Sequence, residues 1–340
     1  MDDVGIVVIG RNEGERLRAC LASVAPLGVA VVYVDSASSD GSPELARSMG
    51  AHAIELSADQ PMTAARGRQH GLDWLGREHP GVKFVLFIDG DCIWEQAFVA
   101  EGRAFLLEHA DYAGVCAKRY ETRTAESFWS RLIDIDWDVP PGDVAYVGGD
   151  AMYRVTALDE AGGWSMDLIA GEEPDRCFRL AALPSVWKFR RIPGKMTGHD
   201  IAMTHTTQYL RRFARTGHAY AQVGWRHRKG AGRRWWRSAI SMSVYALVLP
   251  AIAIAGGWLH WAVPLVILAM YVALVFRVYR WVRLRGGDRS LALAYAVFNL
   301  IGKFAGPWGM LRYFWSRLIG RRTPLMEYHR PSPTMEETRG

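Results

Sequence analysis

A run of 39 residues without Lys, Arg, Asp or Glu, Ser238–Phe276, limits most strongly what this chain can fold into. One membrane crossing needs about 20 apolar residues, so the run is long enough for two helices that cross a membrane. Gly256-Gly257 near the middle predicts the turn between them, and Trp258 and Trp261 beside this turn are typical of a membrane interface. The alternative is a buried helical hairpin in a soluble protein.

Basic residues flank this apolar run on both sides. Residues 226–237 contain six Lys/Arg, and residues 277–289 contain five. Because Lys and Arg are enriched on the cytoplasmic side of membrane spans, both ends of the hairpin are predicted to lie in the cytoplasm. The expected location is therefore the bacterial inner membrane, with a multi-pass anchor and a cytoplasmic N-terminal domain.

The segment after the hairpin, residues 290–320, is apolar but is interrupted by charges and by Gly306-Pro307. A full third span would place Arg321 and Arg322 outside, against the charge rule, so we expect interfacial or re-entrant helices here. Residues 321–340 are polar and predict a flexible tail. The predicted parts are a domain over 1–225, a basic linker over 226–237, two transmembrane helices over 238–279, the apolar helices over 290–320, and the tail over 321–340.

Charge divides the chain in the same way. Residues 226–340 contain 18 Lys/Arg and 4 Asp/Glu, whereas residues 1–225 contain 23 Lys/Arg and 31 Asp/Glu. The basic excess therefore lies at the predicted membrane end, where anionic headgroups attract it, and it does not indicate a nucleic-acid partner. No signal peptide is expected, and the cysteines lack metal-binding spacing. The cysteines are Cys20, Cys92, Cys116 and Cys177.

Residues 1–225 alternate strand-like and helix-like segments, which predicts an α/β domain with a mostly parallel sheet. Thr63–Leu75 and the segment after Pro43 are predicted helices. Ligands of such sheets bind beyond the carboxyl ends of the strands. The predicted strands are Val4–Ile9, Val29–Val34, His52–Leu56 and Phe84–Ile88.

The buried strand Phe84–Ile88 ends in two carboxylates, Asp89 and Asp91, separated by one glycine. Two carboxylates at alternate positions can hold one hard cation such as Mg²⁺ or Mn²⁺ against phosphate oxygens. The alternative is a polar turn that merely ends the strand. No Gly-x-Gly-x-x-Gly follows the first strand and no Gly-Lys-Ser/Thr loop occurs, so dinucleotide and ATP-type cradles are disfavoured.

A second acidic loop, Asp35–Ser42, follows the strand Val29–Val34 and is expected at the same edge of the sheet. Asp35, Ser36 and Asp40 can accept hydrogen bonds from a base and from ribose hydroxyls. The alternative is a polar turn that caps the next helix. With the first acidic loop, these residues predict a nucleotide-diphosphate site.

Six motifs, in order and spacing, resemble the family-2 glycosyltransferases of GT-A fold over roughly residues 4–225. They are Val7–Glu13, Val34–Ser42, Ala64–Gln69, Asp89–Asp91, Gly148–Arg154 and Gly171–Leu180. The resemblance implies a nucleotide-sugar donor, held by Asp35 and Asp40 and near Arg66, and a metal held chiefly by Asp91. The donor-binding candidates are Arg11, Asn12, Glu13, Asp35, Ser36, Asp40, Arg66 and Asp89. Gln69 and Ser36 depart from the residues that are commoner in the family.

The same resemblance implies that Glu173 deprotonates the acceptor, with Glu172 and Asp175 beside it, although Asp is commoner at the position of Glu173. From the residues alone, three acids within four positions could be a charged helix start, where acids meet the helix dipole favourably. Clustered like charges also raise the pKa of at least one member, as a general base requires.

Gly148, Gly149 and Asp150 are candidates for the acceptor side of the site. The two glycines lack side chains that would keep a sugar away, and Asp150 could accept an acceptor hydroxyl. A tight turn is the equally weighted alternative.

Three histidines, His199, His205 and His218, lack the Cys partners or the His-Glu-x-x-His pattern of a zinc site. We expect one or two of them to line the diphosphate, and we add His199 to Asp91 and Asp89 as a candidate metal ligand. Arg211 and Arg212 lie in a partial match to the Gln-x-x-Arg-Trp motif of processive synthases. They are predicted to reach the leaving diphosphate, since guanidinium groups suit phosphate oxygens; the alternative is solvated helix charges.

Together these features predict an inverting, metal-dependent, non-processive glycosyltransferase. It would move a sugar from a nucleotide diphosphate, expected to be UDP, to a lipid-linked acceptor in envelope or exopolysaccharide synthesis. One alternative transfers the sugar directly to a polyprenyl monophosphate. An alternative of another class is a catalytically silent membrane scaffold that binds nucleotide sugar. Membrane lipids are expected partners, and a homo-oligomer stays open.

Overall fold

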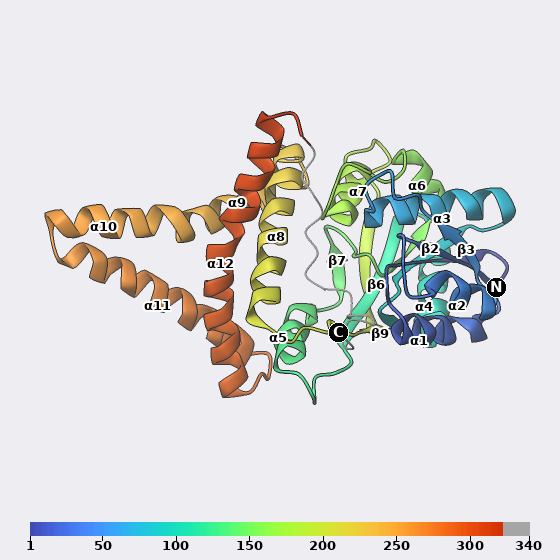
Figure 1. Cartoon of the computed structure of the whole chain (residues 1–340), viewed down its shortest axis with the longest axis horizontal. Coiled ribbons are helices and arrows are strands. Elements are labelled where there is room, and N and C mark those ends of the chain that lie inside the picture. The colour runs from blue at the N-terminus through green and yellow to red at the C-terminus, as the bar shows by residue number, and fades with distance from the viewer. Residues whose placement is uncertain (322–340) are drawn as a thin grey trace, which may run out of the picture.

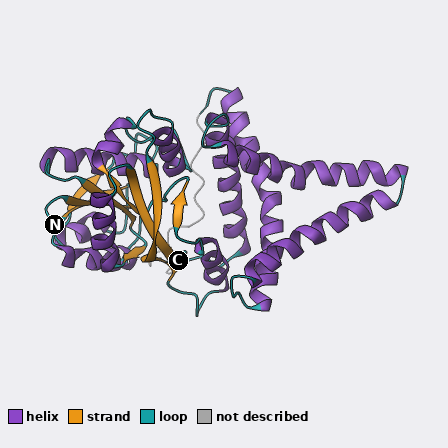
Figure 2. Cartoon of the chain, turned by 180° about the vertical axis from the view of Figure 1, so that it is seen from behind, coloured by secondary structure: helices purple, strands orange, loops and turns teal. Residues whose placement is uncertain are grey.

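The computed structural model describes residues 1–321, in which an α/β domain is followed by long helices and a projecting helical hairpin (Figure 1). The predicted flexible tail lies, from residue 322 on, outside the described residues. Figure 2, seen from behind, shows the same division between the strand-containing domain and the all-helical remainder.

A sheet of nine strands forms the centre of the α/β domain. Eight strands follow the order β3-β2-β1-β4-β8-β6-β9-β5, and β7 pairs with β9. The expected mostly parallel sheet is confirmed for β1 to β4, whereas β8, β5 and β7 pair antiparallel with their neighbours. The strands are β1 Val4–Gly10, β2 Ala30–Asp35, β3 His52–Glu55, β4 Phe84–Asp89, β5 Cys92–Trp94, β6 Tyr112–Glu121, β7 Gly142–Val144, β8 Ala151–Arg154 and β9 Lys188–His199.

Helices cover both faces of this sheet (Figure 1). Their starts follow local sequence rules: the hydroxyl of Thr63 accepts a hydrogen bond from Arg66 N at 3.2 Å, and Pro43 lies in the first turn of α2. The strands β1 and β4 are buried on both faces, as their apolar runs predict. The helices are α1 Glu15–Val24, the short 3₁₀ turn Ala25–Leu27, α2 Ser42–Ser48, α3 Ala64–Glu78, α4 Gln96–Glu108, α5 Phe128–Trp137, α6 Val155–Glu160 and α7 Glu172–Ala181.

The C-terminal helices are α8 Thr206–Arg226, α9 Arg233–Ser243, α10 Leu249–Leu259, α11 Ala262–Arg283 and α12 Arg289–Leu318, with a π-helical segment, Val244–Val248, between α9 and α10. Two continuous helical stretches, Arg233–Leu259 and Ala262–Arg283, are long and apolar enough to cross a membrane. Only 22% and 11% of their most apolar windows are buried, and the hairpin of α10 and α11 projects away from the α/β domain (Figure 1).

The predicted turn at Gly256-Gly257 is wrong by a few residues. Both glycines lie inside α10, and the chain reverses at His260 and Trp261. A Cβ at Gly256 would lie 2.4 Å from Val263 Cγ1, so this glycine lets the two helices of the hairpin approach closely. Its role is helix packing rather than chain reversal.

The apolar segment that Gly306-Pro307 interrupts in the sequence forms one continuous helix, because α12 has 30 residues and contains Pro307. Its glycines pack against α8 at backbone distance: a Cβ at Gly309 would lie 1.8 Å from Ala214 O, and one at Gly217 would lie 2.1 Å from Gly306 O. Such close packing against α8 holds the helix through the proline, although the proline removes one hydrogen bond.

Candidate functional site

The two acidic loops flank the end of β1, as the sequence predicts. In the sheet, Gly10 pairs with Asp35 of β2, and Ile9 pairs with Asp89 of β4. A third element reaches this edge from far along the chain, because β5 and β9 are antiparallel and place Cys92 opposite His199. The loop of Asp91 and the end of β9 therefore meet.

Asp91 and His199 lie side by side, supported by a buried carboxylate. His199 Nε2 is 3.4 Å from Asp91 Oδ2, and His199 Nδ1 is 2.5 Å from Glu121 Oε1. Glu121 is 3% exposed and also accepts hydrogen bonds from Trp137 Nε1 and Ile201 N. A carboxylate that holds one imidazole nitrogen while the other faces a second carboxylate is the usual support of a metal-binding histidine.

Cys92 lies within 4.8 Å of the ligand atoms of Asp91 and His199, so these three could hold a metal ion by distance. However, burial raises the pKa of the Cys92 thiol, and its sulfur lies 3.3 Å from Asp91 Oδ1 and 3.4 Å from Asp150 Oδ2. A protonated thiol is placed to donate to these carboxylates. Asp91 and His199 are therefore the better ligand pair.

Asp89, which we predicted as a metal ligand, is paired with a guanidinium instead. Arg68 Nη2 donates to Asp89 Oδ1 at 2.8 Å. Gly90 turns sharply between the two acids, with its N–H donating to Ile9 O at 2.7 Å, so Asp89 and Asp91 face different partners. Asp91 is thus the acid that faces His199, and a metal-binding role of Asp89 stays a prediction.

Arg68 is the centre of the acidic cluster and was missed by the sequence argument. Its side chain is 2% exposed, and Nη1 lies 2.9 Å from Glu172 Oε1 and 3.2 Å from Glu173 Oε1. One guanidinium thus joins the loop of Asp89 to the start of α7. This contact neutralises part of the buried negative charge of the site.

The two glutamates at the start of α7 differ in environment. Glu172 is buried and held by Arg68, whereas the side chain of Glu173 is 18% exposed. Burial and the charge of Glu172 raise the pKa of Glu173 to about 7, against the opposing effect of Arg68. Glu173 is therefore the more accessible carboxylate and has the pKa of a general base at neutral pH.

Asp175, the third acid of this cluster, has a structural role. It is fully buried, and both oxygens are occupied by Ser165, Arg179, Arg226 and His227. Hydrogen bonds and nearby positive charges hold the pKa of Asp175 below its usual range despite burial, which alone would raise it. That Asp175 also contributes to catalysis stays a prediction.

The two glycines and Asp150, which we predicted for the acceptor side of the site, have different surroundings. A Cβ at Gly149 would lie 2.3 Å from Arg68 Nη2 and 2.8 Å from Glu173 Oε1, whereas Gly148 faces open space. Gly149 therefore makes room for the Arg68–Glu173 pair. Asp150 is 2% exposed and is bound by Thr197 Oγ1 at 2.9 Å and Arg119 Nη1 at 3.2 Å, so it positions neighbours rather than an acceptor.

The predicted nucleotide loops are fastened to each other. Asn12 N donates to Ser38 Oγ at 2.9 Å, Asn12 Oδ1 accepts from Ser39 N at 2.8 Å, and Asp40 Oδ2 accepts from Gly14 N at 3.0 Å. Asn12 has a left-handed φ of 55°, an uncommon conformation that clusters at ligand sites. These bonds hold the loop after β1, which contains Arg11, against the loop after β2, which contains Ser36.

Asp35, at the end of β2, is buried, and its oxygens accept hydrogen bonds from Tyr33 Oη at 2.8 Å and from Ser38 N at 2.7 Å. Glu13 lies near Asp91: burial and the charge of Asp91 raise the pKa of Glu13 to about 7. Arg66 is turned to the protein, since its Nη1 donates to Ser57 O at 2.9 Å and holds the loop before α3.

The indole of Trp137 lies near two arginines and near His199. Its indole lies 5.0 Å from Arg119 Cζ and 5.6 Å from Arg212 Cζ, and its ring centroid is 6.4 Å from that of His199. Arg212 also pairs with Asp136 Oδ2 at 3.6 Å. Arg211 is exposed on α8.

The other two histidines are remote from this arrangement. His205 is the exposed N-cap of α8, and His218 is buried against Tyr313 of α12, where burial lowers its pKa to about 4. The sequence analysis missed Arg119 and Glu121, because the charged residues at the end of β6 form no recognisable motif. Only the pairing of β6 with β9 reveals them.

Comparisons with known proteins find a matching family model and solved structures of similar fold. The model described as glycosyl transferase family 2 matches residues 5–162. Among solved structures, the mannosyltransferase PcManGT from Pyrobaculum calidifontis, in complex with GDP-Man and Mn²⁺, is 17% identical with a TM-score of 0.57, over 93% of this chain and 88% of that one. A glucosyl-3-phosphoglycerate synthase from Mycobacterium tuberculosis is 16% identical with a TM-score of 0.47, over 65% and 78%. No curated protein sequence matches.

Proposed function

We propose that this chain is a family-2 glycosyltransferase of GT-A fold, because residues 5–162 match the model of that family and the fold is similar to that of a solved mannosyltransferase. The reaction is the transfer of a sugar, with inversion, from a nucleoside diphosphate to a hydroxyl of a lipid-linked acceptor. The observation that carries it is one cluster in which the Asp91–His199 pair is joined to the Glu173 carboxylate through a chain of side-chain contacts. The chain consists of Cys92, Arg119, Asp89 and Arg68.

A divalent cation fits the residues present. Asp91 and His199 would hold it, and Glu121 fixes the imidazole so that Nε2 faces Asp91. When bound, the cation neutralises the charge that develops on the leaving diphosphate. Mg²⁺ prefers an all-oxygen shell, so an imidazole ligand favours a transition ion such as Mn²⁺. The structural neighbour with GDP-Man and Mn²⁺ supports the same assignment.

The metal assignment predicts a specific loss of binding. His199→Gln and Asp91→Asn should each abolish Mn²⁺-dependent binding of UDP or GDP, measured by titration calorimetry on the full chain. Glu121→Gln, which only loosens the imidazole, should weaken Mn²⁺ binding about 10- to 100-fold. His52→Gln, an exposed histidine on β3, is the matched control and should change nothing. Unaltered Mn²⁺ binding in His199→Gln would contradict the assignment.

The proton of the acceptor hydroxyl passes to Glu173 in this proposal. A sugar hydroxyl is a weak nucleophile at neutral pH, so a carboxylate must accept its proton as the bond to the donor carbon forms. Glu173 is the one acid of the α7 cluster that combines access to solvent with a raised pKa. Arg68 keeps the carboxylate in place, and Gly149 leaves the space for this contact.

The acceptor is proposed to be lipid-linked because of the hairpin. Helices Arg233–Leu259 and Ala262–Arg283 expose large apolar side chains over their length, as a lipid-facing hairpin does. The basic residues before and after it favour a cytoplasmic site, where nucleotide sugars are made. Two such helices offer little material for a translocation channel, which favours transfer of one sugar over polymerisation.

This topology can be tested by labelling of single cysteines. The four native cysteines are buried, so an introduced cysteine reports its own position. His260→Cys, at the tip of the hairpin, should react with a membrane-impermeant maleimide in intact cells. Lys229→Cys, which is exposed before α9, should react only after permeabilisation. The reverse pattern would place the site in a compartment without nucleotide sugars.

A further inference from the structure

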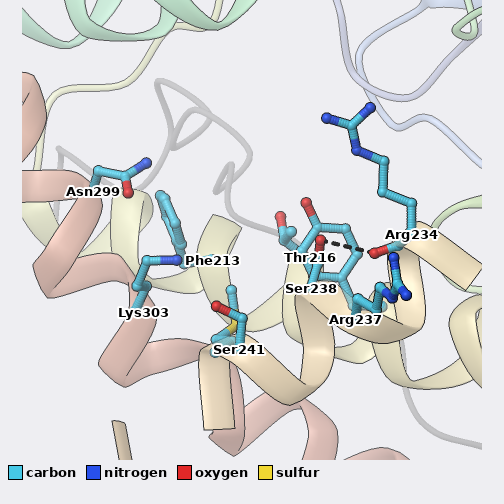
Figure 3. Close-up of a pocket in the computed structure, with 10 residues that line it drawn as sticks. Phe213, Thr216, Arg234, Arg237, Ser238, Ser241, Asn299 and Lys303 are labelled. Carbon is cyan, nitrogen blue, oxygen red and sulfur yellow. Dashed lines mark hydrogen bonds between the residues drawn. The ribbon is translucent and has the colours of Figure 1, made fainter. Parts of the chain in front are cut away.

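A cavity of about 300 Å³ lies outside the metal and glutamate cluster, between α8, α9 and α12 (Figure 3). Arg234, Arg237 and Lys303 line it together with polar groups such as Asn299, and Phe213 forms an apolar wall. None of the residues around Asp91 or Glu173 lines this cavity. It is therefore a separate site.

The cavity carries positive charge without a matching acid. No carboxylate lines it, and in the part of the chain that the structure describes, none of its three cations is within 4.0 Å of one. Burial and the charge of Arg277 lower the pKa of Lys303. An anion in the cavity would stabilise the charged form of Lys303. Lys and Arg side chains are also suitable hydrogen-bond donors to the oxygens of a phosphate.

The position of the cavity points to a lipid as the source of that anion. Arg234 and Arg237 lie in the first two turns of the candidate span Arg233–Leu259, and the next Lys or Arg in the sequence after Arg237 is Arg277. A hairpin inserted in a membrane therefore holds these arginines at the level of the headgroups, where lipid phosphates lie. Phe213 and Met242 line the same cavity and can contact the first carbons of a lipid chain.

Aromatic side chains connect this cavity with the glutamate helix. Tyr220 of the cavity contacts Trp235 edge to face at 5.0 Å between ring centroids, and Trp235 contacts Phe178 of α7 at 6.0 Å and Tyr146 at 5.6 Å. A Cβ at Gly171, the N-cap of α7, would lie 3.2 Å from the Trp235 ring. Trp235 thus lies between the cavity and the start of the helix that carries Glu173.

We propose that this cavity binds the phosphate or diphosphate group of the lipid-linked acceptor. The inference rests on the proposed function and narrows it. Because Tyr220, Trp235 and Phe178 lie between the cavity and the helix of Glu173, a phosphate in the cavity is not the attacking group. The acceptor is therefore a lipid phosphate that already carries a sugar, whose hydroxyl reaches Glu173. Direct transfer to a polyprenyl monophosphate is disfavoured on this geometry.

The test is binding of a polyprenyl diphosphate to the full chain in neutral detergent, measured by native mass spectrometry in EDTA so that the metal site does not hold it. Geranylgeranyl diphosphate should bind at least about tenfold more tightly than geranylgeraniol or inorganic diphosphate. Arg237→Gln combined with Lys303→Gln should weaken it about tenfold or more, equivalent to about 1.4 kcal/mol. Arg237→Gln alone, at an exposed position, should give part of this loss without affecting folding.

Arg233→Gln is the matched control, because Arg233 is exposed on the same helix but does not line the cavity. The affinity of Arg233→Gln for geranylgeranyl diphosphate should stay within about twofold of the wild-type affinity. Equal affinity of wild type and the double variant would overturn the proposal, as would displacement of the diphosphate by phosphatidylglycerol at equal concentration, which indicates a general headgroup site. Mn²⁺-dependent UDP binding is measured on EDTA-free aliquots of the same preparations; its absence in wild type would instead count against the glycosyltransferase site itself.

Discussion

Glu173→Gln is expected to lower kcat about 10²- to 10⁴-fold while leaving donor binding nearly unchanged, the usual contribution of a positioned general base. Glutamine keeps the size of the side chain, and its carbonyl oxygen can still lie near Arg68 Nη1, which is 3.2 Å from Glu173 Oε1. The change therefore removes basicity and little else. The measurement is steady-state transfer to a lipid-linked sugar, with the donor affinity determined separately by calorimetry.

The pH profile provides a second readout of the same prediction. Only the deprotonated carboxylate can accept a proton, and burial with the charge of Glu172 raises the pKa of Glu173 to about 7. Wild-type kcat should therefore rise with pH through about 7 and level off above it, and Glu173→Gln should lack this inflection. Glu172→Gln is the matched control and should cost much less. A larger loss in Glu172→Gln would make Glu172 the base, and no loss in Glu173→Gln would favour a phosphate nucleophile.

Arg68→Met is expected to produce the largest loss of stability. It removes the guanidinium that Asp89, Glu172 and Glu173 share, and a buried pair that loses one partner costs about 3–5 kcal/mol. The melting temperature should fall by about 10 °C. Arg68 also lowers the pKa of Glu173, so in the folded fraction the inflection of kcat should move to higher pH.

The control for this variant is Arg103→Met, which breaks the Arg103–Asp3 pair at the surface. A surface pair of this kind is worth about 1 kcal/mol or less, so the melting temperature should change little. Arg68→Lys keeps the charge but not the planar fork and should fall between wild type and Arg68→Met. An unchanged melting temperature in Arg68→Met would show that the acids do not depend on this guanidinium.

Much of the fold could be predicted because its signals are local. The strands at Val4, Phe84 and His52 begin at the predicted residues, and Thr63 caps the predicted helix. The position of Asp35 and Asp89 on either side of β1 follows from parallel pairing alone. The turn of the hairpin was misplaced because Gly256 reads as a loop residue in the sequence, whereas its function is close contact with Val263.

The supporting residues of the site could not be predicted, because they depend on long-range pairing. Glu121 meets His199 only through the register of β6 and β9, and Arg68 meets Glu172 across 104 positions in the sequence. For the same reason the surroundings of Asp150 and Asp175 could not be predicted. Both resemble accessible acids in the sequence, but the fold surrounds them with donors.

The most direct test of the account is metal-dependent release of nucleoside diphosphate from nucleotide sugars. The purified full chain, with a lipid-linked sugar in detergent and Mn²⁺, is assayed against a panel of UDP- and GDP-linked hexoses. The account predicts that at least one donor is consumed, that EDTA abolishes this turnover, and that Asp91→Asn lacks it. Full turnover in EDTA or in Asp91→Asn would contradict the central claim that Asp91 and His199 hold the catalytic cation.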